Sequence, residues 1–243
     1  MSLLSIRGLS KSFRGLRALR EVDLEVEEGQ ILGVIGANGA GKTTLFNCIT
    51  GAFAPDTGQV LLDGRDVTGM ATHRLVRHGM VRTFQLMRPF ASMSVLENVT
   101  VAAWSARGGR ERAAREHAAQ VLERTGLTGW AQRPSGALPA AVQKRLELAR
   151  ALATRPRVLL LDEVLAGLVP AERAPVLQLL EELRDEGTTM VFIEHIMAAV
   201  RQLSDSVVMM DSGAVLARGQ VDDVLADPRV VEAYLGKEFR RAS

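Results

Sequence analysis

The chain has 243 residues, of which 47% are hydrophobic and 24% charged. This composition excludes an intrinsically disordered chain and allows one large domain, or a core with a subdomain. The formal net charge is only +2, and the basic residues are spread along the chain, so the sequence predicts no nucleic-acid partner.

The sequence also lacks the signals of a membrane or secreted protein. No apolar run approaches the roughly 18–20 residues that a membrane span needs, and the first residues do not have the pattern of a secretory signal. The single cysteine, Cys48, is expected to be a small buried side chain. We therefore expect a cytosolic protein without disulfide bonds.

Two half-exposed antiparallel strands are predicted first, over residues 3–7 and 22–27, because apolar and polar residues alternate there. Phe13 lies in the polar segment between them. Its surroundings leave two interpretations open, a core side chain or an aromatic ring that stacks on a purine.

A glycine-rich turn follows the apolar strand predicted over residues 31–35. Residues 36–43 have the pattern Gly-x-x-x-x-Gly-Lys-Thr, and helical spacing follows. Glycines let successive N–H groups cradle the phosphates of a nucleotide, and the helix start adds its positive dipole end. Lys42 is expected to reach the β- and γ-phosphates, and Thr43 to offer its hydroxyl to Mg²⁺. The predicted nucleotide-binding residues of this loop are Gly36, Asn38, Gly39, Gly41, Lys42, Thr43 and Thr44.

Short elements and then helices follow the phosphate loop. The short elements are a turn at 55–58, a strand at 59–62, a hairpin-type turn at 63–64, a helix at 73–79 and a strand at 81–85 that ends in Gln85. Helices are predicted over residues 95–103, 112–125 and 140–153. Their Ala- and Arg-rich composition indicates a separate helical subdomain, and the arginines near residues 107–115 indicate a solvated helix face.

Two buried strands organise the C-terminal part. Residues 158–161 are all apolar and are followed by Asp162 and Glu163. After a helix over 171–185, a second buried strand over 189–193 is followed by Glu194 and His195. A β-hairpin over residues 207–217 and a helical tail over 221–235 complete the chain.

The alternation of strands and helices predicts a mostly parallel sheet, whose ligand sites lie at the carboxyl ends of the strands. Asp162 suits the Mg²⁺ shell, and Glu163 can activate the attacking water. Gln85 can contact both metal and water. His195 either hydrogen-bonds the γ-phosphate or is an ordinary polar loop residue. The predicted metal ligands are therefore Thr43, Gln85 and Asp162, and the predicted catalytic residues are Gln85, Glu163 and His195.

In this order and spacing, the residues resemble the ATP-binding subunit of an ABC transporter over essentially the whole chain. Residues 36–44 resemble the Walker A motif, Gln85 the Q-loop, residues 159–163 the Walker B motif and His195 the switch histidine. Phe13 falls where this family stacks an aromatic ring on adenine. The segments that resemble the branched-chain amino acid importer branch are residues 82–85, 94–99, 193–195 and 227–236.

The resemblance implies an α/β fold: a P-loop NTPase (RecA-like) core with a mostly parallel sheet, an antiparallel β subdomain and a helical subdomain. Within one ATPase domain over residues 1–243, residues 1–85 and 154–243 would form the core with its antiparallel β subdomain. Residues 86–153 would form the helical subdomain. The implied activity is hydrolysis of MgATP that powers import of a small solute, expected to be a branched-chain or related amino acid.

The resemblance also implies partners. They are a second ATPase subunit in a head-to-tail homo- or heterodimer, two transmembrane permease subunits and, indirectly, an extracytoplasmic solute-binding protein. The chain would lie in the cytoplasm, peripheral on the inner face of the cell membrane. Residues 86–103 are the expected permease-facing surface. Phe90 and Met93 are candidate contacts, with at least one of them expected in the core instead.

The signature segment departs from the family pattern Leu-Ser-Gly-Gly-Gln, whose second residue is Pro in this branch. Residues 138–142 read Leu-Pro-Ala-Ala-Val. Ala140 and Ala141 are still expected to offer backbone N–H groups to the partner's nucleotide. However, the Ala141 methyl group stands where the backbone must approach a γ-phosphate, and Val142 removes a polar amide.

The loop after the Walker B motif departs as well. Val164 replaces the usual proline, and Val169 stands where Asn or Asp would cross the dimer interface. Pro175 lies deep in the following helix and is expected to kink it. Because the signature serves the partner's nucleotide, this chain's own site can stay active beside a partner with an intact signature. The alternatives are a catalytically weak or non-hydrolytic partner in a heterodimer, and a soluble ABC ATPase outside transport.

Overall fold

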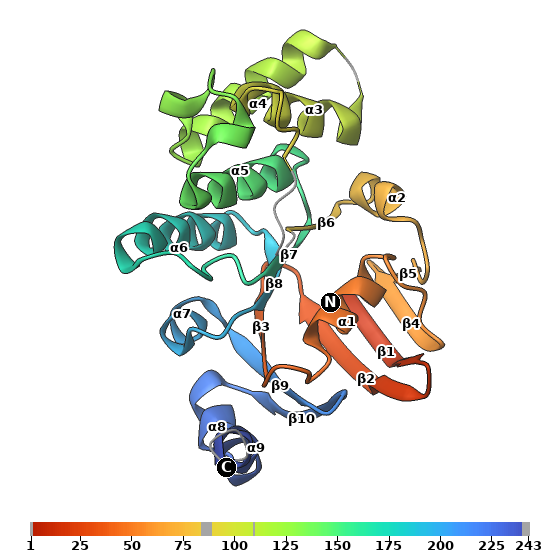
Figure 1. Ribbon diagram of the computed structural model, residues 1–243. Coiled ribbons are helices and arrows are strands. Elements are labelled where there is room, and N and C mark those ends of the chain that lie inside the picture. Colours follow the sequence, from red (N-terminus) through yellow and green to blue (C-terminus); the bar gives the residue numbers. More distant parts are fainter. Residues whose placement is uncertain (1, 84–88, 109, 240–243) are drawn as a thin grey trace.

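A six-stranded sheet with strand order β10-β9-β3-β8-β7-β6 forms the centre of the computed structural model, which describes residues 2–83, 89–108 and 110–239 (Figure 1). The strands are β3 (Ile31–Ile35), β6 (Met80–Arg82), β7 (Val158–Asp162), β8 (Thr189–Ile193), β9 (Ser206–Asp211) and β10 (Ala214–Gly219). All neighbours are parallel except β9 and β10. Every residue of β3, β7 and β8 is buried, which explains their continuous apolar sequences.

A second, antiparallel sheet has the order β2-β1-β4-β5. Its strands are β1 (Ser2–Phe13), β2 (Leu16–Glu27), β4 (Thr57–Leu62) and β5 (Arg65–Asp66). The first two are longer than predicted, because register shifts such as the one between Ile6 and Leu9 interrupt the alternation without ending the pairing. Helix α1 (Lys42–Ile49) packs in one hydrophobic cluster with residues of both sheets. Cys48, on this helix, is a free and buried thiol as predicted.

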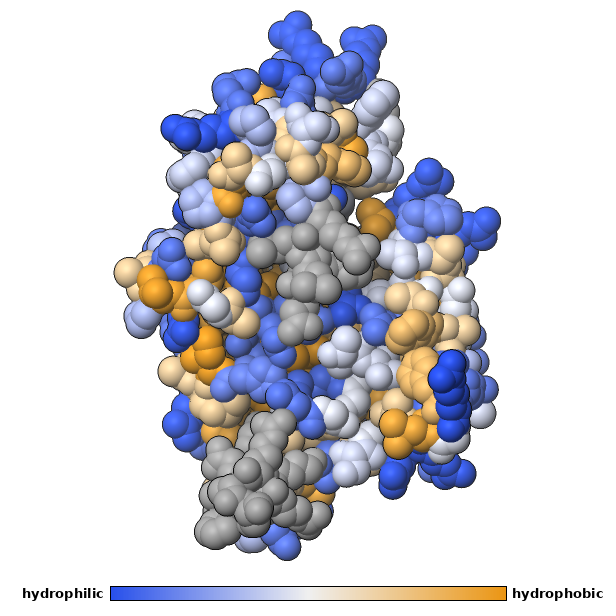
Figure 2. Space-filling view, in the orientation of Figure 1, coloured by the Kyte–Doolittle hydropathy of each residue, from blue (hydrophilic) through white to orange (hydrophobic). Residues whose placement is uncertain are grey.

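Helices α3 (Val95–Arg107), α4 (Glu111–Arg124) and α5 (Ala140–Ala153) pack against one another, far from the antiparallel sheet in Figure 1. Helix α3 begins with a capping box in which Ser94 and Glu97 cap each other's backbone. Two 3₁₀ turns, η1 (Thr128–Trp130) and η2 (Ser135–Ala137), lie between α4 and α5. Hydrophilic side chains cover the outer end of this helical group in Figure 2, as the arginine-rich sequence predicts.

The remaining helices are α2 (Thr72–Arg77), α6 (Pro170–Asp185), α7 (Met197–Leu203), α8 (Val221–Ala226) and α9 (Pro228–Phe239). The sequence did not predict α7, which is too short for clear helical periodicity. Pro175 lies inside α6, which continues beyond it to Asp185. Among the described residues, no helix combines the length and the apolar character of a membrane span.

The predicted strand at residues 81–85 is β6, which already ends at Arg82. Gln85 lies outside the described residues. The subdomain boundary at residues 85/86 lies there too, so the division into core and helical subdomain stays a prediction.

Candidate nucleotide-binding site

The loop between β3 and α1 has a backbone that only glycine fits at two positions. Gly36 has φ +147° and Gly41 has φ +104°. A Cβ on Gly36 would lie 2.3 Å from the Met210 carbonyl oxygen, and one on Gly41 would lie 2.6 Å from that of Ala18. The backbone N–H of Gly213 also donates to the Ala40 carbonyl at 3.0 Å. The loop is therefore held in shape by β2 and the β9–β10 turn.

Lys42 is folded back over this loop. Its side-chain Nζ donates to the carbonyl oxygens of Gly36 at 2.6 Å and Ala37 at 3.1 Å, and the residue is only 6% exposed. The first backbone N–H groups of α1 lie beside it, where a helix start favours anions. The loop thus combines a fixed cation and oriented donors, as a phosphate site requires.

The loop opens into a hollow of about 740 Å³ that is lined by four separate parts of the chain, one of which is Ser212 in the β9–β10 turn. Asn38 and residues 39–44 form one side, and Phe13 and Glu163 contribute from the first strand and from the end of β7. The Phe13 side chain is exposed and meets Phe53 in a T-shaped contact, with ring centroids 5.2 Å apart. The interpretation of Phe13 as a core residue is therefore wrong.

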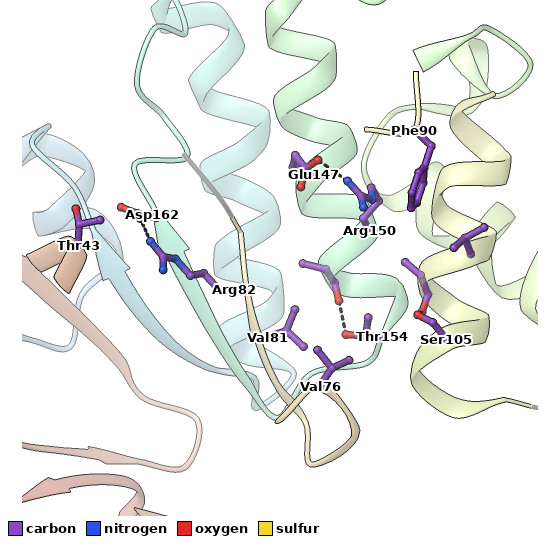
Figure 3. Close-up of a pocket in the computed structure, with 13 residues that line it drawn as sticks. Thr43, Val76, Val81, Arg82, Phe90, Ser105, Glu147, Arg150, Thr154 and Asp162 are labelled. Atoms are coloured by element: carbon purple, nitrogen blue, oxygen red, sulfur yellow. Dashed lines mark hydrogen bonds and ion pairs between the residues drawn. The ribbon is translucent and has the colours of Figure 1, made fainter. Parts of the chain in front are cut away.

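Asp162 is buried at the end of β7 and is ion-paired with a residue that the sequence analysis did not assign to the site. Its Oδ2 accepts from Arg82 Nη2 at 2.6 Å, as Figure 3 shows, and Arg82 Nη1 donates to Asn47 Oδ1 on α1 at 2.5 Å. The Arg82 guanidinium also lies 5.5 Å from the centroid of the Phe46 ring. Arg82 therefore joins β6, β7 and α1. The available signal was a charged residue inside an otherwise apolar short strand.

Glu163 and His195 come together at the ends of two neighbouring strands. His195 Nε2 lies 2.8 Å from Glu163 Oε1. The backbone of Glu163 has φ +50°, a left-handed conformation that is uncommon for a non-glycine residue and that surrounding contacts must maintain. The predicted convergence of these two side chains is thus present in the structure.

Two further ionisable residues contact the backbone around this pair, and the sequence analysis missed them. Glu194 is buried, and its carboxylate accepts from the N–H groups of Leu165 and His195. Burial raises the pKa of Glu194, whereas these N–H donors lower it. The ammonium of Lys144, on α5, donates to the carbonyls of Glu163 and Ala166, and burial lowers its pKa. The signal for Glu194 was the one used for Asp162, a carboxylate directly after an apolar strand.

The signature residues lie apart from this hollow. Ala140 and Ala141 form the first turn of α5 and are not among the described residues that line it. Val142 is 5% exposed and packs in the core of the helical group, so its side chain does not face outward. Val169, at the start of α6, is 56% exposed. The starts of α5 and α6 therefore offer backbone groups, the methyl groups of Ala140 and Ala141, and the exposed side chain of Val169.

The fold and the loop define a P-loop ATPase cassette, with a lysine over a glycine-rich loop and carboxylates at the ends of neighbouring parallel strands. Comparison with known proteins places it more narrowly. A family model described as ABC transporter matches residues 19–166, and one described as branched-chain amino acid ATP-binding cassette transporter matches residues 214–240. The chain belongs to the ABC transporter family and is an ATPase of that family.

Its similarity to individual proteins extends over nearly the whole chain. It is 42% identical over 250 residues to the high-affinity branched-chain amino acid transport ATP-binding protein BraF of Pseudomonas aeruginosa, covering 97% of this chain and 98% of that protein. It is 40% identical over 251 residues to LivG of Escherichia coli K12, with the same coverages. A solved nucleotide-free ATP-binding cassette from an ABC transporter has TM-score 0.87 and 32% identity, covering 96% and 99% of the two chains. The α/β cassette fold and the resemblance to the branched-chain amino acid importer branch are thereby confirmed.

Proposed function

We propose that this chain hydrolyses MgATP to power an importer of branched-chain or related amino acids. The solute class is supported by the names of its relatives and by the family model matched at residues 214–240. The observation that carries hydrolysis is the contact of 2.8 Å between His195 and Glu163, at the edge of the hollow that the phosphate loop lines.

Each side chain has a distinct proposed role. Lys42 and the N–H groups of the loop hold the phosphates, while the exposed ring of Phe13 stacks on adenine. Glu163 accepts a proton from the attacking water. His195 orients that carboxylate and donates to the γ-phosphate as its charge develops. Arg82 keeps the Asp162 carboxylate in place from β6.

Thr43 and Asp162 are the proposed Mg²⁺ ligands among the described residues. A hydroxyl and a carboxylate supply the hard oxygen donors that Mg²⁺ prefers, and Mg²⁺ is commonly held by one or two such side chains together with substrate phosphates. Arg82 pairs with Asp162 Oδ2, and no other hydrogen bond reaches the Asp162 carboxylate among those described. When bound, the ion would neutralise charge on the phosphates. Gln85 stays a predicted third ligand.

The proposed assembly is a head-to-tail dimer of ATPase subunits beneath two permease subunits, with the chain on the inner face of the membrane and a solute-binding protein on the other side. In such a dimer, Ala140 and Ala141 face the partner's nucleotide. The altered signature favours a heterodimer, because a partner with intact glycines would complete the site that this chain's own loop forms.

A cavity of about 830 Å³ beside residues 89–103, the described part of the expected permease surface, supports a permease contact there (Figure 3). The same cavity reaches Thr43, Arg82 and Asp162 of the nucleotide site. Its lining includes Val76 of α2, Phe90, and Arg150 of α5. Phe90 is 46% exposed and lies under Arg150, whose guanidinium is 5.4 Å from the ring centroid. Met93 is 36% exposed, so the expectation that one of these two residues is in the core was wrong.

The test is uptake of radiolabelled leucine, isoleucine and valine by cells of the native host that lack this chain. Uptake should fall, return with the wild-type chain, and stay low with Glu163→Gln at equal expression. If the uptake of none of these amino acids depends on the chain, the proposed solute class is wrong.

The altered signature favours a second candidate, a subunit that closes on ATP without turnover. It predicts nucleotide binding but no hydrolysis, even beside an ATPase with an intact signature. Turnover that depends on Glu163 would exclude it. A soluble ABC ATPase outside transport is disfavoured by the match to the transporter-specific model at residues 214–240.

A further inference from the structure

Glu194 is a buried carboxylate for which the proposed reaction has no use. It directly follows β8 and is 1% exposed. A buried carboxylate is costly unless hydrogen bonds satisfy it, so its partners indicate what it stabilises.

Those partners belong to two neighbouring loops. Glu194 Oε1 accepts from the N–H of Leu165, in the loop after β7, at 2.8 Å. Its Oε2 accepts from the N–H of His195, in the loop after β8, at 3.2 Å. One carboxylate therefore bridges the two loops that carry Glu163 and His195.

Lys144 holds the same loop through two of its carbonyl groups. Its Nζ donates to the carbonyl of Glu163 at 3.3 Å and also to that of Ala166. Its positive charge lies near the carboxylates of Glu194 and Glu163. Because Lys144 is on α5, it fastens the loop to the helix that begins at the signature segment.

We infer that Glu194 is a positioning residue, which holds Glu163 and His195 in contact by joining the loop after β7 to the loop after β8. The left-handed backbone at Glu163 needs such outside support, and Glu194 holds the Leu165 N–H while Lys144 holds the Glu163 carbonyl. A carboxylate suits the position because two N–H donors need two acceptor oxygens, whereas an amide offers one acceptor and one donor. The inference rests on the proposed roles of Glu163 and His195.

The test compares Glu194→Gln with Asp205→Asn, a matched control whose carboxylate accepts the backbone N–H of Ile31 at the amino end of β3, away from the site. Glu194→Gln should lower kcat by about tenfold to a hundredfold, as small misplacements of reacting groups do, with the Kd for ATP within about twofold. Asp205→Asn should leave kcat unchanged. The double variant Glu163→Gln/Glu194→Gln should be no slower than Glu163→Gln alone, because Glu194 acts through Glu163.

A measurement without turnover separates this inference from the proposed function. The ring ¹⁵N signals of His195, one of four histidines, can be assigned with His195→Ala. In Glu194→Gln, the ring ¹⁵N chemical shifts of His195 should move toward the values that they have in Glu163→Gln, because both variants weaken the contact between His195 and Glu163. If wild-type turnover did not depend on Glu163, the proposed function would fail, while these signals would still decide the role of Glu194.

Three results would overturn the inference: unchanged kcat and unchanged His195 signals in Glu194→Gln, a parallel loss of ATP affinity, or additive losses in the double variant. If Glu194→Gln does not fold, Lys144→Met decides by the same comparison, since it keeps the aliphatic stem and removes only the ammonium. It should lower kcat and shift the His195 signals in the same direction.

Discussion

The two ends of the ATP machinery in this chain are built very differently. Around the phosphate loop, most substitutions would disturb the structure. A side chain at Gly36 or Gly41 would clash with neighbouring backbone, and the buried Asp162 is paired with Arg82. At the signature end, the side chains of residues 138–142 carry no polar atom, and Val142 is part of the core. The phosphate-loop end has the polar residues expected for an ABC ATPase, whereas the signature end keeps the helix α5 but not the polar residues of the signature.

This difference is informative because the two ends serve different nucleotides in the proposed dimer. In that proposal, the phosphate loop, Glu163 and His195 act on the ATP of this chain, whereas residues 138–142 face the ATP of the partner. Substitutions at the two ends should therefore affect different sites, and the following predictions test that separation.

The largest effect is expected at Glu163. Glu163→Gln should lower kcat by about 10²–10⁴-fold, since it removes the proposed general base, while ATP binding persists. The measurement is steady-state phosphate release together with the Kd for ATP. Glu116→Gln, on an exposed pair of α4, is the matched control and should change neither. Equal turnover of Glu163→Gln and wild type would contradict the assignment.

Arg82→Ala should cost about 3–5 kcal/mol of unfolding free energy, because it leaves Asp162 buried without its cation. The two side chains are 5% and 2% exposed. Arg124→Ala, which breaks an exposed pair with Glu186, should cost about 1 kcal/mol or less. Urea unfolding of both variants measures these losses. Equal losses of unfolding free energy would show that the buried Arg82–Asp162 pair stabilises the protein no more than an exposed surface pair.

Ala141→Gly tests the signature end. Where this chain's signature serves a nucleotide, as in a homodimer, turnover should rise several-fold because the methyl group no longer blocks the backbone. Glycine in the first turn of α5 should cost about 0.5–1 kcal/mol of stability. Ala119→Gly, on the exposed face of α4, controls for the helix effect. A loss of stability without a gain in turnover would mean that the methyl group is not the obstacle.

The smallest response is expected at Cys48. Burial raises the pKa of this thiol to about 11, so little thiolate exists at pH 8. A thiol reagent at that pH should label the unfolded chain quickly and the native chain slowly. The native rate should rise as the pH approaches 11 and level off above it, and it should be the same in Ala141→Gly. Faster labelling in that variant would mean that the two ends are coupled through α1.

The sequence was sufficient for the phosphate loop, the buried strands and α5, because glycine spacing and apolar runs report local backbone directly. It did not identify Arg82 or Glu194 as members of the site. Their importance depends on partners 80 and 29 residues away in the chain, which no local pattern contains. The exposure of Phe13 was equally undetermined, since it depends on how the first hairpin meets the turn that carries Phe53.

The most direct test of the division between the two ends is ATP turnover of this chain alone and mixed with an ATPase of the same importer that has an intact signature. Turnover should be slow for this chain alone and should rise on mixing, and that rise should be lost when only this chain carries Glu163→Gln. Turnover alone as fast as in the mixture, or a rise that survives Glu163→Gln in this chain, would contradict that division.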